Sequence, residues 1–104
     1  MFMADNKLKV IFSKSGDMRY ISHLDLMRLF HRASRRAELP VTLTKGFSPH
    51  LKISIAKALK LGKESLNEEA VFCMDRCVEP DSFIKAINEK LPEGVKVSAA
   101  AENT

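Results

Sequence analysis

Four arginines recur at helical spacing in the stretch SHLDLMRLFHRASRRAELP, residues 22–40, and guanidinium groups in such a row can bind phosphates. A helix turns about 100° per residue. The row therefore shares one side of a helix, and its members are Arg28, Arg32, Arg35 and Arg36. Phosphate contacts supply most of the non-specific affinity of proteins for nucleic acids. The row predicts an RNA-binding surface; the alternative is a solvated helix face that is neutralised by acids elsewhere, such as Glu64, Glu68 or Glu69.

The segment TKGFSPH, residues 44–50, brings an aromatic side chain together with cations. An exposed Phe47 could stack on an RNA base, whereas a Phe47 that folds inward would cover the core. The other residues of the predicted binding set are Arg19, Lys45, His50 and Lys52. The letters KGF begin like the RNP1 motif of RNA recognition modules, but the continuation SP departs from that motif. We therefore do not assign an RNA recognition module.

Two histidines and one carboxylate are weak candidates for acid–base chemistry. His23 stands at the predicted helix start, where the backbone amides and the helix dipole favour a neutral imidazole that can accept a proton. Together with Asp25 and His50 it could activate a ribose 2′-hydroxyl and cleave RNA without a metal. The alternative makes Asp25 a capping acid and His23 a surface residue, which leaves no catalytic residue.

Metal and cofactor sites are not predicted. Cys73 and Cys77 are four residues apart without a second pair or a nearby histidine, so zinc binding is not supported. The letters LGKES lack the first glycine of a phosphate-binding loop. We expect neither a metal nor a cofactor.

The elements that must position these residues follow from periodicity. Apolar residues alternate in four segments, which predicts strands at 7–12, 41–55 (interrupted by a loop at 45–50), 68–74 and 94–99. Helical spacing predicts one helix that starts after the N-cap Ser22 and is stopped by Pro40, and a second over 82–91. The segment 13–19 is expected to be a loop. The order predicts an α+β, ferredoxin-like βαββαβ fold, an antiparallel sheet with two helices on one face.

Length and composition fit one small domain. The chain has 104 residues, of which 45% are hydrophobic and 29% charged. We expect disordered ends at 1–6 and 101–104 around one domain at 7–100. Residues 1–60 hold twelve Lys or Arg against four acids, a balance of +8, whereas residues 61–104 have a balance of −4. An anionic partner should therefore meet the first part. The first residues, MFMADNK, do not have the pattern of a signal peptide, and no apolar run approaches the roughly 20 residues of a membrane span, so we expect a cytoplasmic protein without a membrane partner.

Several segments together are similar to a known bacterial family. They are RYISHLDLMRLFHRASRRAELPV, TKGFSPHLKISIAKAL, LGKES and the strand EEAVF. The chain resembles, over roughly residues 7–99, the N-terminal part of the radical-SAM-linked family, a domain of unknown function found fused to or encoded beside radical SAM proteins. The resemblance implies a radical SAM protein as partner. The cluster motif CxxxCxxC is absent from this chain, so it is not itself the radical enzyme.

The preferred hypothesis is a non-catalytic accessory domain of a radical SAM system that binds RNA or presents a substrate through its basic helix. The second hypothesis is a protein-interaction module that docks on the radical SAM partner, because buried Arg anchors and a Phe plug also suit protein interfaces. A metal-independent ribonuclease that uses His23 and His50 is the third.

Overall fold

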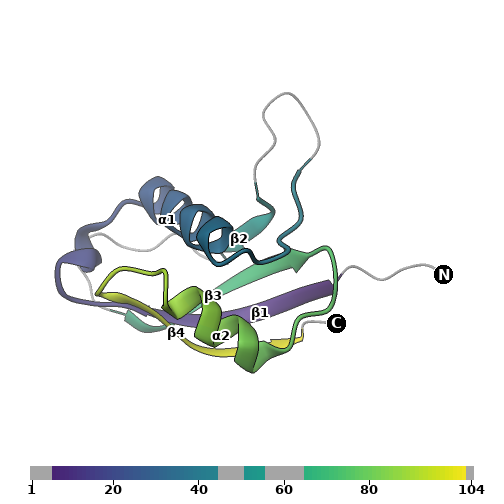
Figure 1. Ribbon diagram of the computed structural model, residues 1–104. Helices are drawn as coiled ribbons and strands as arrows, with labels where there is room; N and C mark the ends of the chain where they lie inside the picture. Colours follow the sequence, from purple (N-terminus) through teal and green to yellow (C-terminus); the bar gives the residue numbers. More distant parts are fainter. Residues whose placement is uncertain (1–5, 45–50, 56–64, 103–104) are drawn as a thin grey trace.

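The computed structural model describes residues 6–44, 51–55 and 65–102. In this part the elements are β1 (Asn6–Lys14), a short 3-10 helix η1 (Gly16–Tyr20), α1 (His23–Arg36), β2 (Ile53–Ile55), β3 (Ser65–Met74), α2 (Pro80–Asn88) and β4 (Val95–Glu102). The strands form one antiparallel sheet in the order β2-β3-β1-β4 (Figure 1). The predicted α+β class is confirmed, and the element order is compatible with a ferredoxin-like fold.

Strand β1 lies in the centre of the sheet and has two different faces. Its side chains alternate, because Leu8, Val10 and Phe12 are buried whereas Lys7 and Lys9 are exposed. The buried side chains face the helices and form part of the core. One face of the sheet is therefore the floor of the core, and the other face carries charged residues.

Four phenylalanine rings join the sheet to both helices. Phe30 of α1 meets Phe12 of β1 at 5.0 Å between ring centroids and Phe72 of β3 at 5.6 Å. Phe72 in turn meets Phe83 of α2 at 5.1 Å. All three contacts are edge to face, the geometry that aromatic pairs prefer. Because Phe72 touches a ring from each helix, α1 and α2 cover the same face of the sheet.

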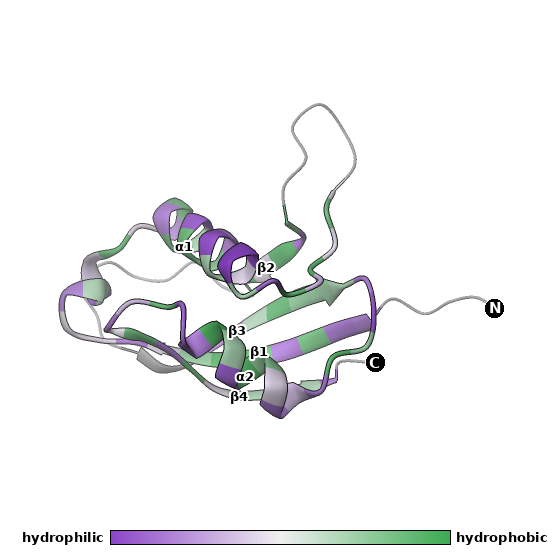
Figure 2. Cartoon of the chain, viewed as in Figure 1, coloured by the Kyte–Doolittle hydropathy of each residue, from purple (hydrophilic) through white to green (hydrophobic). Residues whose placement is uncertain are grey.

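Helix α1 begins where the sequence predicts. The Ser22 hydroxyl accepts a hydrogen bond from the Asp25 backbone N–H at 3.1 Å, which satisfies one of the open amides of the first turn. The apolar side of the helix buries Leu26, Phe30 and Ala33. Figure 2 shows hydrophilic residues along most of the visible side of α1. Burial of one side thus fixes which residues face solvent.

The predicted end of α1 at Pro40 is wrong, because the helix ends at Arg36. Glu38 has a φ of 56°, and the backbone N–H groups of Glu38 and Leu39 donate to the carbonyls of Arg35 and Ser34. These two bonds form a Schellman motif, which normally has glycine in the left-handed position. Because glutamate rarely takes this position, Glu38 did not indicate the end of the helix in the sequence.

The first half of the interrupted strand, residues 41–44, is not a strand. Val41 bridges to Met74 of β3, but Leu43 bridges to Leu51 instead. The segment changes its partner after one residue, so it cannot build a ladder with either neighbour. Residues 45–50, predicted as a loop, lie outside the described part of the chain, and β2 begins only at Ile53.

Other boundaries also differ from the predictions. The expected loop at 13–19 is divided between the end of β1 and the 3-10 helix η1. Helix α2 starts at Pro80, which occupies the first turn, and ends at Asn88 rather than at residue 91. Strand β3 starts at Ser65, three residues before the predicted start.

The ends of the sheet also extend beyond the predicted domain of 7–100. Strand β1 begins at Asn6, opposite Met74. Strand β4 continues to Glu102, where Ala101 and Glu102 pair with Lys9 and Leu8. Residues 6, 101 and 102 pair with neighbouring strands of the sheet, a contact that composition does not show.

Candidate nucleic-acid interface

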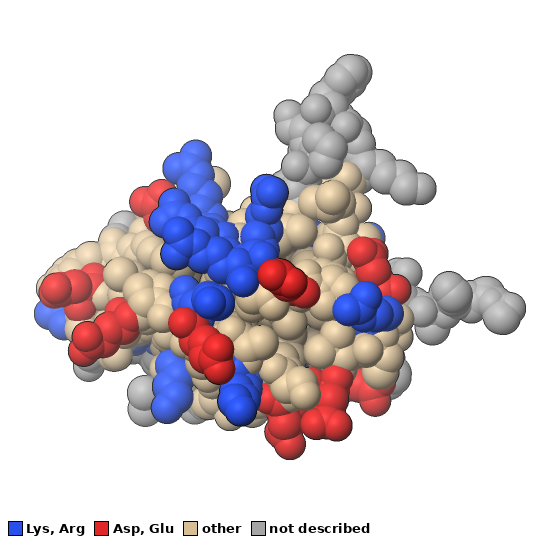
Figure 3. All heavy atoms as spheres, viewed as in Figure 1, with Lys and Arg blue, Asp and Glu red and all other residues tan. Residues whose placement is uncertain are grey.

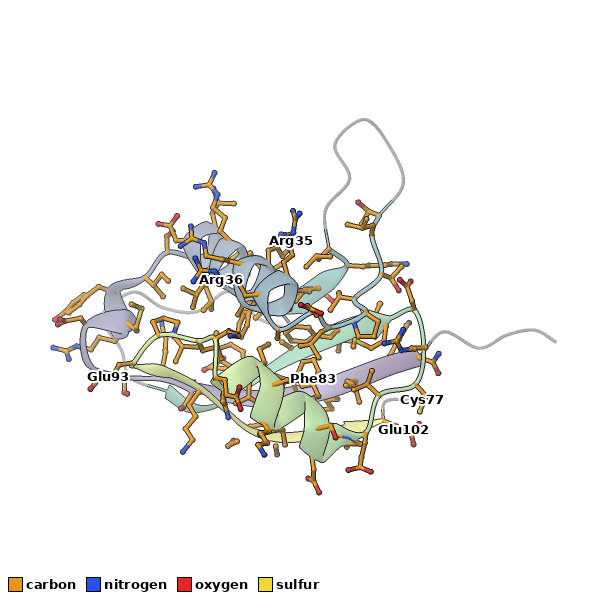
Figure 4. All side chains as sticks on the ribbon, in the orientation of Figure 1. Arg35, Arg36, Cys77, Phe83, Glu93 and Glu102 are labelled. Atoms are coloured by element: carbon orange, nitrogen blue, oxygen red, sulfur yellow. The ribbon has the colours of Figure 1, made fainter. Side chains whose placement is uncertain are left out.

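The four arginines of α1 share the side of the helix that faces away from the sheet. We call this set the arginine surface; it consists of Arg28, Arg32, Arg35 and Arg36, all of them exposed. Figure 3 shows Lys and Arg side chains gathered over α1, and Figure 4 shows Arg35 and Arg36 on that helix. Together with the half-buried His31 they line an open depression of about 430 Å³. The structure therefore brings the predicted row together.

Most of the arginine surface is not neutralised by the described part of the domain. Arg28 pairs with Asp25 at 3.4 Å, and both side chains remain more than half exposed. Among residues 6–44, 51–55 and 65–102, no carboxylate lies within 4.0 Å of the guanidinium groups of Arg32, Arg35 or Arg36. An exposed pair like that of Arg28 contributes little stability.

The acids that were candidates to neutralise the arginines do not pair with them in the part of the chain that the structure describes. Glu69 of β3 pairs with Lys9 of β1 at 3.3 Å, on the face of the sheet opposite to the helices. Glu68 is paired in register with Phe12. Glu64 lies outside the described residues. The described part of the chain thus gives no support to a solvated helix face neutralised by Glu68 or Glu69.

Arg19 lies in η1, before α1, and its guanidinium group is held in place. It donates to the Gly16 carbonyl oxygen at 3.2 Å and to the Tyr20 hydroxyl at 2.9 Å. Its Cζ atom stands 4.6 Å from the centroid of the Tyr20 ring, a cation–π contact. Tyr20 was not among the sequence candidates. An isolated exposed tyrosine belongs to no periodic pattern, and only its position just before the helix start could have indicated it.

The remaining members of the predicted binding set are only partly placed. Lys52 is exposed, and its backbone N–H donates to the Thr42 carbonyl oxygen. The other three, Lys45, Phe47 and His50, lie outside the described residues. The choice between an exposed and an inward Phe47 therefore stays a prediction.

The structure describes two of the three candidates for acid–base chemistry. His23 is exposed at the first position of α1. The Asp25 carboxylate accepts a hydrogen bond from Arg28, so it is bonded to a member of the arginine surface. The third residue, His50, lies outside the described part, and the pairing of the histidines stays a prediction.

The cysteines have different environments. Cys73 is buried in β3, whereas the exposed Cys77 has its sulfur 3.7 Å from a carboxylate oxygen of Glu102 (Figure 4). In the described residues no three His, Cys, Asp or Glu side chains are grouped as metal ligands. Within the same residues, neither helix has the length and apolar composition needed to span a bilayer.

Sequence comparison places the chain in a family without giving it a reaction. No curated protein matches it. Residues 7–104 match DUF2344, a family described as an uncharacterized protein conserved in bacteria. That description names no ligand and no partner, so the link to radical SAM proteins stays a prediction. The match spans nearly the whole chain, and the chain therefore belongs to the bacterial family DUF2344.

Proposed function

We propose that the protein is a non-catalytic accessory domain of a cytoplasmic radical SAM system and binds RNA through the arginine surface. The observation that supports this proposal is the lack of a described carboxylate within ion-pair distance of Arg32, Arg35 and Arg36. Guanidinium groups form two parallel hydrogen bonds to a phosphate, so three such groups can hold a nucleic-acid backbone. The link to radical SAM proteins rests on the sequence resemblance alone.

The spacing of the arginines suits a linear polyanion. Arg28, Arg32 and Arg36 follow at intervals of four residues, which is about 6 Å of helix rise. Like charges this close repel one another by roughly a few tenths of a kcal/mol per pair in the free protein. A bound polyanion relieves that repulsion and releases its own counterions. Both effects favour binding.

The sheet is a poor alternative surface for RNA in this protein. RNA recognition modules stack bases on aromatic side chains of the open sheet face. Here Phe12 and Phe72 of the two central strands are fully buried against the helices. The other face has Ile11 and Val71 at its centre, and none of its described side chains is aromatic. We therefore assign RNA contact to α1.

The test is a titration of labelled tRNA and rRNA fragments, followed by fluorescence anisotropy at low and at physiological salt. Arg32→Glu combined with Arg35→Glu reverses two charges of the arginine surface and should weaken binding by about tenfold or more. Lys85→Glu with Lys90→Glu is the matched control, since it changes the net charge equally in α2 and just after its end, and it should have a much smaller effect.

Two results would contradict the proposal. One is the absence of binding even at low salt. The other is equal binding by the wild type and the Arg32→Glu, Arg35→Glu variant.

A second candidate function is docking on a protein partner, and one observation favours it. Leu24 is 58% exposed one turn before Arg28, on the same side of α1. An exposed leucine beside arginines suits a protein groove with an acidic rim. Capture of a radical SAM protein that survives nuclease treatment and is lost on Leu24→Ser, while RNA affinity is unchanged, would favour this candidate.

A further inference from the structure

We infer that the RNA bound by this domain is single-stranded and that one of its bases stacks on Tyr20. This inference rests on the proposed RNA-binding function and specifies the substrate class. Tyr20 is 55% exposed at the end of η1. Of the aromatic residues that the structure describes, it alone is exposed, because Phe12, Phe30, Phe72 and Phe83 are fully buried.

The Tyr20 ring is held before any ligand arrives. Arg19 lies over the ring and also donates to its hydroxyl, while a second nitrogen of the same guanidinium group donates to the Gly16 carbonyl. The backbone carbonyl of Arg19 accepts from the Nζ atom of Lys14, a lysine that is only 1% exposed. A side chain fixed in this way loses little conformational entropy on binding, which favours stacking.

The position of Tyr20 also fits an RNA strand whose path runs along α1. Only Ile21 and Ser22 separate it from α1, and Arg28 stands five residues after His23, about 7–8 Å of helix rise. A chain with one base on Tyr20 can thus continue with its phosphates over the arginine surface.

This arrangement selects for unpaired nucleotides. In a duplex each base is stacked between its neighbours, and its face is not available to a protein side chain without unstacking. In a single strand every base has a free face, and stacking on an aromatic residue is tolerant of sequence. The arginines alone would accept either form, so Tyr20 is the residue that discriminates between them.

Tyr20 can report on its own contact, because the chain contains one tyrosine and no tryptophan. The experiment titrates the full chain with a short oligouridine, excited at the red edge of tyrosine absorption where this RNA absorbs little. Tyrosine emission should fall and level off at the same RNA concentration as the anisotropy of a labelled oligonucleotide. The Arg32→Glu, Arg35→Glu variant binds weakly, so any fall in its emission measures optical absorption by the RNA. At this excitation wavelength its emission should stay nearly constant over that range.

Affinity provides the second measurement. Tyr20→Leu should weaken oligouridine binding by about fivefold to a hundredfold, whereas Tyr20→Phe should retain most of the affinity. A duplex of equal length should bind more weakly than the single strand to the wild type. Tyr20→Leu should reduce this preference. The circular dichroism spectrum of each variant confirms that it is folded.

The outcomes separate this inference from the function on which it rests. Single-strand binding with unchanged Tyr20 emission, or an affinity that Tyr20→Leu does not alter, overturns the stacking contact and leaves RNA binding in place. Equal affinity for duplex and single strand overturns the substrate class. Failure to bind either RNA overturns the proposed function itself.

Discussion

At the scale of single residues, the 3-10 helix η1 that presents Tyr20 depends on a glycine far from it in sequence. Gly94 has a φ of 100°, and a Cβ atom there would lie 2.8 Å from both the Met18 Cγ atom and the Ser15 carbonyl oxygen. The Ser15 N–H donates to the Gly94 carbonyl at 2.8 Å. The turn before β4 therefore packs directly against η1, and only glycine fits there.

Gly94→Ala should destabilise the protein by about 2 kcal/mol or more, because the left-handed backbone costs about 1–2 kcal/mol and the methyl group also collides with backbone. Gly16→Ala is the matched control. Gly16 also has a positive φ, of 59°, but nothing lies within 4 Å of its added Cβ, so only the backbone cost of roughly 1 kcal/mol applies. Urea unfolding of both variants measures the difference, and equal losses would contradict this account.

The residues of the candidate site were unequally predictable. The arginine row has a helical period, and the pattern alone placed it on the solvent side of α1. Lys14 was missed because alternation from Leu8 to Phe12 puts position 14 on the buried side, where a lysine is not expected. Its Nζ atom is accommodated because it reaches the Arg19 carbonyl. Such a partner is a fact of tertiary structure, which no local pattern contains.

At the scale of elements, α2 protects the outer edge of β4. Strand β4 has β1 on one side, and the Asn88 side chain occupies part of the other. Its amide nitrogen donates to the Val97 carbonyl and its amide oxygen accepts from the Val97 N–H, both at 2.9 Å. The amide imitates the backbone of a neighbouring strand, and so satisfies one residue of an edge that could otherwise pair with another chain.

Asn88→Ala should lower the free energy of unfolding by about 1–3 kcal/mol, because it leaves both backbone groups of the buried Val97 without their partner. Ser98→Ala is a control on the same strand. The Ser98 hydroxyl donates to the Ile11 carbonyl at an exposed site, and its loss should change stability by less than about 0.5 kcal/mol. Urea unfolding measures both. A loss on Asn88→Ala no larger than that of the control would show that the edge contact is unimportant.

Local signals predicted the elements better than their boundaries. The start of α1 was correct because Ser22 and Asp25 interact within one turn. The segment 41–44 was wrong as a strand because a strand needs a continuous partner, and this segment divides its bridges between Met74 and Leu51. Partner choice depends on residues distant in the chain, so β-propensity alone cannot determine it.

At the scale of the whole molecule, charge is distributed unevenly. The first sixty residues have a balance of +8, and the arginine surface collects four of these charges on α1. Whether such charges are neutralised depends on where the acids come to lie in the fold. Glu69 is directed to Lys9 across the sheet, a placement that the sequence could not reveal. The charge asymmetry was therefore predictable, whereas its lack of compensation had to be observed.

Affinity for single-stranded RNA should fall steeply with salt. Each neutralised phosphate contributes about −0.7 to the slope of log K against log salt, so four arginine contacts give a slope of about −3. The Arg32→Glu, Arg35→Glu variant should have a slope smaller by about 1.4 or more. Anisotropy titrations at several salt concentrations measure both slopes. An affinity independent of salt would exclude phosphate contacts as the main source of binding.

The pairing of β1 with β4 also constrains when this protein can fold in the cell. The first strand lies between β3 and β4, and Leu8 is opposite Glu102. During translation the arginine helix leaves the ribosome long before the strand that completes the sheet beneath it. The sheet can therefore be completed only after residue 102 has cleared the exit tunnel, and until then the basic segment emerges without the strand that completes the sheet beneath it.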